Sequence, residues 1–177
     1  MPPANLFILG APRSGTSLTS GILSDAGYWH GENPVPTDER NPHGYFESGD
    51  GIFINEEMLK PVIRRLPGAV WRFLQARGWQ SLARPFFPAL TPYGNRFLAH
   101  IRPDTTIPKP IAEHRERMRI TVSRQPFCLK DPRLCYTLNH WRDQAPDSRM
   151  ICVFRDPYVT AQSMIRFPWP FTPARAL

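Results

Sequence analysis

Three short, mostly apolar runs along the chain each end in a polar or charged turn. Residues 6–9 (LFIL) are followed by a glycine-containing loop, residues 125–129 (QPFCL) by the sequence KDPR, and residues 150–154 (MICVF) by RDP. Short apolar runs of this kind are typical of parallel strands in a sheet that is covered on both faces. The pattern therefore predicts three parallel strands, each with a polar turn at its carboxyl end.

A helical pattern follows each of these turns. The first helix is predicted over residues 16–26, and the other two over residues 134–144 and 158–166. One face of the first helix carries its large apolar side chains, Leu18, Ile22 and Leu23. Strand, turn and helix thus repeat at least three times, which predicts an α/β fold with a parallel β-sheet flanked by helices. Ligands of such folds bind beyond the carboxyl ends of the strands, where all three polar turns are expected.

The middle of the chain is less regular. Helices are predicted over residues 52–66, with a kink or boundary at Pro61, and over residues 69–83. Residues 84–110 show no clear pattern, and residues 111–123 fit a helix or a strand equally well.

The composition of the 177-residue chain fits a packed globular protein with one domain. Hydrophobic residues make up 41% of the chain and aromatic residues 12%, which argues against disorder. The 22 Lys and Arg residues exceed the 15 acidic residues, and a net charge of +7 favours an anionic ligand. The basic residues are scattered, so the sequence does not predict nucleic acid as a partner.

The cysteines and the apolar segments indicate the compartment. The three cysteines lack the spacing of zinc ligands, and Cys128 and Cys152 lie in apolar strand-like runs, which predicts buried, reduced thiols. The apolar run near the N-terminus is too short for a signal peptide, and no segment approaches the ~20 apolar residues of a membrane helix. We therefore expect a cytoplasmic protein that does not bind a membrane.

The turn after the first strand has the residues of an anion-binding loop. Its sequence, GAPRSGTS over residues 10–17, nearly matches the nucleotide-binding pattern G-x-x-x-x-G-K-[ST], with Thr16 in the lysine position and Arg13 inside the loop. The two glycines allow the backbone to curl around an anion, with amides and the helix N-terminus directed at it. Without the lysine, magnesium-assisted transfer of a γ-phosphoryl group is disfavoured. The guanidinium of Arg13 instead suits a terminal oxyanion.

Four segments together resemble the sulfotransferase family that uses 3′-phosphoadenosine 5′-phosphosulfate (PAPS). Residues 12–17 (PRSGTS) resemble the loop that binds the 5′-phosphosulfate, and residues 154–165 (FRDPYVTAQSMI) resemble the 3′-phosphate motif. Residues 41–47 (NPHGYFE) and 130–134 (KDPRL) are similar to two motifs of bacterial sulfotransferase-like proteins. The KDP of the latter also resembles a turn of tyrosylprotein sulfotransferases. The four segments occur in the expected order, and the match spans residues 6–166.

The resemblance implies a fold, a co-substrate and a class of acceptor. The fold would be that of P-loop nucleoside triphosphate hydrolases, with PAPS as the sulfonyl donor and no metal. The acceptor would be a small molecule, a carbohydrate or a peptide that carries a hydroxyl or an amine. We expect one sulfotransferase-like domain over residues 1–177, without the glycine-rich basic stretch that usually follows in the family.

The resemblance also assigns roles to individual residues. Arg13 would bind the sulfonyl oxygens and the bridging oxygen of the leaving phosphate, and Lys130 would assist the transfer. Arg155 and Ser163 would bind the 3′-phosphate. The remaining donors to the 5′-phosphosulfate would come from the loop, at Ser14, Gly15, Thr16 and Ser17. A structural alternative for Lys130 is an ion pair with Asp131, although Asp131 and Arg133 are expected to pair with each other or with loops.

Sulfonyl transfer also needs a base that accepts the proton of the acceptor. Glu47 is the first candidate because it ends the NPHGYFE segment, in the long polar loop over residues 28–50. Glu32, in the same loop, is its rival. Three histidines are further candidates, His30, His43 and His114.

Two other classes of function stay open. A P-loop nucleotide kinase or hydrolase would bind ATP in a magnesium-dependent manner. A catalytically inactive anion-binding protein of the same fold would bind adenosine 3′,5′-bisphosphate without transferring a sulfonyl group to any acceptor.

Overall fold

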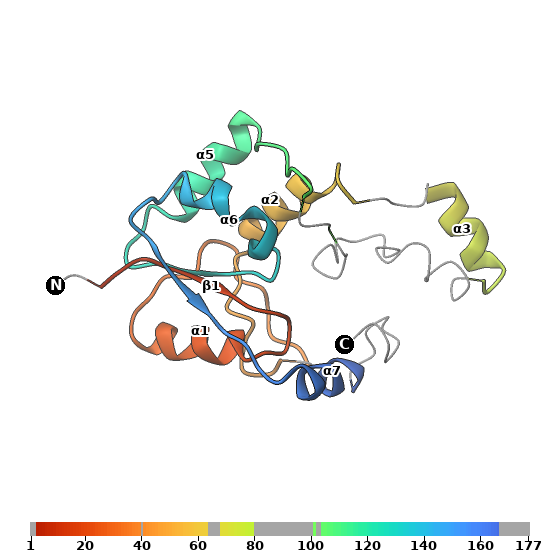
Figure 1. The fold of residues 1–177 in the computed structure, drawn as a ribbon, viewed down its shortest axis with the longest axis horizontal. Coiled ribbons are helices and arrows are strands. Elements are labelled where there is room, and N and C mark those ends of the chain that lie inside the picture. Colours follow the sequence, from red (N-terminus) through yellow and green to blue (C-terminus); the bar gives the residue numbers. More distant parts are fainter. Residues whose placement is uncertain (1–2, 40, 64–67, 80–100, 102–103, 167–177) are drawn as a thin grey trace.

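A computed structural model of the protein describes residues 3–39, 41–63, 68–79, 101 and 104–166. Within this part of the chain, three parallel strands form one sheet with helices on both faces (Figure 1). The predicted α/β fold class is therefore confirmed.

The strands place the three polar turns at one edge of the sheet. The central strand β1 (Leu6–Leu9) pairs in parallel with β2 (Cys128–Lys130) on one side and with β3 (Arg149–Cys152) on the other. In this register Ile8 lies opposite both Lys130 and Ile151. Because all three strands run in the same direction, the segments that follow them meet at their carboxyl ends, as the sequence predicts.

The predicted helices are present with somewhat different ends. The structure contains α1 (Thr16–Asp25), α2 (Gly49–Leu59), α3 (Gly68–Ala76), α5 (Ala112–Thr121), α6 (Leu134–Arg142) and α7 (Pro157–Ile165). Helix α2 ends just before the expected boundary at Pro61. Helix α5 lies within residues 111–123, the segment whose pattern fitted a helix or a strand equally well. The predictions for residues 80–100 lie outside the described residues.

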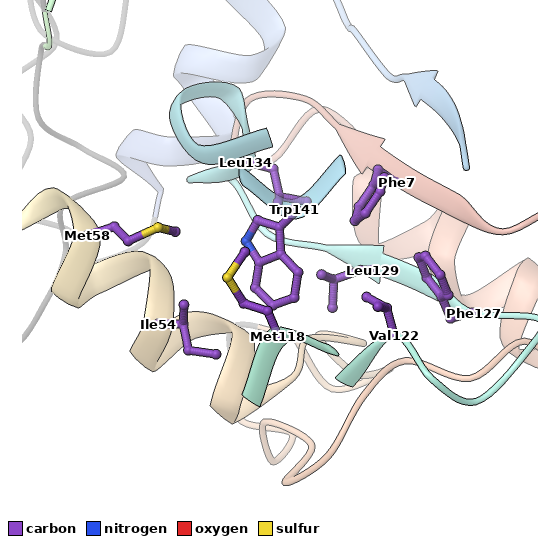
Figure 2. Packing of buried hydrophobic residues seen from close by; sticks show 9 residues of the cluster. All are labelled: Phe7, Ile54, Met58, Met118, Val122, Phe127, Leu129, Leu134 and Trp141. Atoms are coloured by element: carbon purple, nitrogen blue, oxygen red, sulfur yellow. The ribbon is translucent and has the colours of Figure 1, made fainter. Parts of the chain in front are cut away.

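The main core lies between one face of the sheet and helices α2, α5 and α6 (Figure 2). Phe7 and Phe127 meet edge to face, with their ring centroids 5.4 Å apart. Trp141 of α6 is fully buried, and its indole N–H donates to Oδ1 of Asn55 at 2.8 Å. The buried members of this core are Phe7, Ile54, Met58, Met118, Val122, Phe127, Leu129, Leu134 and Trp141. This core holds α5, which precedes β2, and α6, which follows it, against the sheet.

Helix α1 covers the opposite face of the sheet, but not with the side chains that its pattern predicted (Figure 1). Leu18 and Ile22 are 71% and 62% exposed, whereas Thr16 and Ser20 are buried. The predicted apolar face is therefore wrong, apart from Leu23, which packs on the sheet. Because the helix begins directly at the loop, the loop sets its first turn, and positions 16, 20 and 23 share the face that lies on the sheet.

The cysteines only partly follow the prediction. All three are free thiols, and Cys128 is buried, which raises the pKa of its thiol to about 12. Cys152 is exposed, so the prediction of a buried thiol there is wrong. Cys152 belongs to β3, whose described residues form an edge of the sheet where Met150 is also 48% exposed. Among the described helices, none combines the length and the apolar character that crossing a bilayer requires.

Candidate functional site

The turn between β1 and α1 is a tight loop attached to the end of β3. Arg13 and Gly15 have positive φ angles of 68° and 107°, a conformation that turns successive amides toward one side. A Cβ atom at Gly10 would lie 2.4 Å from the carbonyl oxygen of Val153, so only glycine fits there. Ser14 donates to the same carbonyl at 3.2 Å. The loop is therefore held in one conformation against the sheet.

Helix α1 starts in this loop without a side-chain cap. Its N-cap residue is Gly15, which has no side chain to accept hydrogen bonds from the amides of the first turn. At α2 and α7, by contrast, the side chains of Ser48 and Asp156 accept a bond from a first-turn amide. The start of α1 thus combines uncapped amides with the positive end of the helix dipole, an arrangement that suits an anion.

Lys130, at the end of β2, is buried beside the loop. Its side chain is 3% exposed, its Nζ atom donates to Oγ of Ser17 at 3.2 Å, and it forms a salt bridge with Glu47. The acidic partner of Lys130 is thus Glu47, while Asp131 pairs with Arg133. A cation, a loop hydroxyl and a carboxylate therefore lie in direct contact at the carboxyl edge of the sheet.

Burial changes the acidity of Glu47. Its side chain is 12% exposed, and desolvation raises the pKa of the carboxyl, although the charge of Lys130 opposes this effect. A carboxylate whose pKa lies nearer to neutral pH is a stronger base than an exposed glutamate. Glu47 therefore holds a proton more readily than an exposed glutamate does.

Asn41 brings the NPHGYFE segment onto the same loop. Its Nδ2 atom donates to Oγ of Ser17 at 3.2 Å and to the carbonyl oxygen of Gly44 at 2.6 Å. The segment that ends at Glu47 is therefore tied to the loop both through Asn41 and through Lys130.

Arg13 joins the loop to the segment that follows β3. Its Nε atom donates to Oγ of Ser163 on α7 at 3.2 Å, although the two residues are 150 positions apart in the sequence. Arg155 is exposed in the turn between β3 and α7, and Asp156 caps α7 by accepting from the amide of Val159. The two segments with similarity to phosphate-binding motifs are thus neighbours in the fold.

Comparison with models of protein families decides the assignment. The model described as "Sulfotransferase family" matches residues 3–175, nearly the whole chain. The chain belongs to the sulfotransferase family. Searches of curated proteins and of solved structures found no match. The family has a P-loop-like fold, in agreement with the parallel sheet and the glycine-containing loop of this sulfotransferase.

The other candidate bases of this sulfotransferase lie in different surroundings. Glu32 is exposed, and its backbone carbonyl accepts from Oγ of Ser48. His30 packs against the ring of Phe46, and burial lowers the pKa of its imidazole. Of the other two candidate histidines, His43 is exposed, and the ring of His114 meets Phe53 edge to face.

The sequence correctly predicts that Asp131 and Arg133 pair, but it misses the third member of their cluster. The guanidinium of Arg133 forms a salt bridge with Asp131 at 2.9 Å and a second one with Glu56 of α2. Glu56 is an acidic residue on the buried side of a helix, and this is the signal that could have identified it. The cluster fixes the turn after β2 and, with it, the position of Lys130.

The described residues contain no group of three or more His, Cys, Asp or Glu side chains that could hold a metal ion. Three charged side chains lie around the loop of this sulfotransferase, Arg13, Glu47 and Lys130.

Proposed function

We propose that this protein transfers a sulfonyl group from PAPS to a hydroxyl or an amine of a small molecule, a carbohydrate or a peptide. The observation that carries the proposal is the position of Lys130, whose ammonium contacts both Ser17 of the loop and Glu47. Membership of the sulfotransferase family supplies the reaction type. The contacts around the loop support the choice of donor and the roles of individual residues.

The contact between Arg13 and Ser163 supports a ligand with two anionic ends. The amides of residues 13–17, including that of Ser14, would hold the 5′-phosphosulfate at the start of α1 together with the hydroxyls of Thr16 and Ser17. Arg155 and Ser163 would bind the 3′-phosphate. One ribose carries both phosphates, so the residues that bind them must lie close together. The hydrogen bond between Arg13 and Ser163 brings the two segments this close.

The same residues can perform the transfer. Glu47 accepts the proton of the acceptor, whose oxygen or nitrogen forms a bond to sulfur while the bond from sulfur to the bridging oxygen breaks. The leaving group, adenosine 3′,5′-bisphosphate, takes the electron pair of that bond. Arg13 and Lys130 stabilise the charge that develops on the bridging oxygen and the sulfonyl oxygens.

Thr16 distinguishes this proposal from a nucleotide kinase or hydrolase. The residue occupies the position of the lysine in the nucleotide-binding pattern, and it is only 5% exposed. A buried threonine supplies no ammonium to β- and γ-phosphates. The nearby ammonium comes from Lys130 instead, and it is paired with Glu47.

Titration calorimetry with adenosine 3′,5′-bisphosphate tests the proposed site. Arg13→Ala and Arg155→Ala are each expected to weaken binding by roughly 10- to 100-fold, because each removes a charge-assisted hydrogen bond to the ligand. Arg119→Ala is the matched control, since Arg119 is exposed on α5 and pairs with Glu116. Equal affinity in the three variants and the native chain would remove the basis of the site. Binding without transfer to any acceptor would identify an inactive anion-binding protein.

A further inference from the structure

We infer that Asn41 is a positioning residue, which together with Lys130 fixes the hydroxyl of Ser17 as a donor to the 5′-phosphosulfate. The inference rests on the proposed function, because it assigns the ligand of the hydroxyl to the sulfonyl donor. It concerns a residue for which the similarity to sulfotransferases supplies no role.

The hydrogen bonds of Ser17 leave its proton for a ligand. A hydroxyl can accept two hydrogen bonds and donate one. Oγ of Ser17 accepts from Nδ2 of Asn41 and from Nζ of Lys130, each at 3.2 Å. Both acceptor positions are thus used, and no described residue accepts the proton of Ser17. The hydroxyl is therefore prepared to donate at the place where the loop amides also converge.

The orientation of the Asn41 amide is itself fixed. The second hydrogen of Nδ2 is donated to the carbonyl oxygen of Gly44 at 2.6 Å, and a carbonyl can only accept. The backbone N–H of Asn41 donates to Asp38, whose Oδ1 also accepts from the hydroxyl of Tyr45 at 2.6 Å. Reversing the amide would place its oxygen against Gly44. Asn41 therefore presents N–H, and not oxygen, to Ser17.

This arrangement selects the charge of the ligand. Ser17 occupies the position at which nucleotide hydrolases bind Mg²⁺ through a lone pair of the hydroxyl. Here Asn41 and Lys130 occupy both lone pairs, so the hydroxyl offers a proton to an anionic oxygen and no electron pair to a cation. The donor is oriented before the ligand binds, which lowers the cost of reorganisation.

A double-mutant cycle measured by calorimetry tests the inference, with adenosine 3′,5′-bisphosphate and adenosine 3′-monophosphate as the two probes. Asn41→Ala is expected to weaken binding of the bisphosphate by about fivefold and to leave binding of the 3′-monophosphate unchanged, since only the bisphosphate has a 5′-phosphate. In the Ser17→Ala background the same substitution is expected to have no further effect. Tyr45→Phe is the control, because it loosens the same turn without touching Ser17.

A second variant guards against loss of folding. Asn41→Asp keeps the size of the side chain but replaces the N–H donor with an acceptor, so it is expected to weaken bisphosphate binding at least as much as Asn41→Ala. The role of Asn41 would be overturned if the losses of bisphosphate affinity from Asn41→Ala and Ser17→Ala were additive in the double variant. An equal loss of affinity for the 3′-monophosphate would also overturn it. A native chain that does not bind the bisphosphate at all would overturn the proposed function itself, and the inference with it.

Discussion

Glu47→Gln is expected to lower the rate of sulfonyl transfer by roughly 10²- to 10⁴-fold, the loss typical of removing a general base. The amide keeps the size of the side chain but cannot accept the proton of the acceptor. Binding of adenosine 3′,5′-bisphosphate is not expected to weaken, because Lys130 loses an anion that competes with the ligand. The measurement is transfer of radiolabelled sulfur from PAPS to a panel of alcohols, phenols and amines.

The pH dependence of the rate provides a second readout of Glu47. Burial raises the pKa of this carboxyl, and only the deprotonated form acts as a base. The rate should therefore rise with pH and level off above that pKa. The midpoint of this rise, the acid limb of the profile, is expected at a higher pH than the value of about 4.3 typical of glutamate. Glu32→Gln is the matched control and should retain both the rate and the limb. Loss of activity in Glu32→Gln, with activity retained in Glu47→Gln, would assign the base to Glu32.

Arg133→Met is expected to lower the free energy of unfolding by about 3–5 kcal/mol, the range measured when one member of a buried ion cluster is removed. Arg133 is 6% exposed, and the carboxylates that it pairs with, Asp131 and Glu56, are 3% and 10% exposed. Methionine fills much of the same space but removes the cation that the two buried carboxylates share. Denaturant unfolding of the native chain and the variant measures the difference.

One control makes the result on Arg133 specific. Arg119→Met removes an arginine from a solvent-exposed ion pair with Glu116, and it is expected to leave unfolding essentially unchanged. A variant as stable as the native chain would show that the cluster does not hold the turn after β2.

The sequence was sufficient to predict the architecture around the site. Parallel strands leave their following turns at one edge, so three short apolar runs followed by polar turns already placed residues 10–17, 130–133 and 155–157 near each other. The glycines of the first loop indicated a close approach of backbone segments, and Gly10 indeed lies against the carbonyl of Val153. These features depend on local pattern and on the geometry of a parallel sheet.

The contacts made by the long loop after α1 were beyond prediction from the sequence. Residues 28–48 have no periodic pattern, and the path of an irregular loop depends on tertiary contacts such as the hydrogen bond from Asn41 to Ser17. For the same reason the sequence offered only Asp131 as an ionic partner of Lys130, whereas the structure pairs Lys130 with Glu47. The predicted inward face of α1 was also wrong. The preceding loop sets the rotation of the helix about its own axis, and periodicity alone does not show this.

Binding of adenosine 3′,5′-bisphosphate and of ATP, each measured with a chelator and with excess Mg²⁺, tests most directly whether the loop holds a sulfated nucleotide without a metal. The bisphosphate is expected to bind with the same affinity in both conditions, because the protein itself supplies the donors. Main-chain amides, Arg13 and the hydroxyl of Ser17 would bind the 5′-phosphate, and Arg155 and Ser163 would bind the 3′-phosphate. ATP is expected to bind more weakly in both. Tighter binding of ATP than of the bisphosphate, with a requirement for Mg²⁺, would contradict a sulfonyl-donor site and indicate a nucleotide kinase or hydrolase.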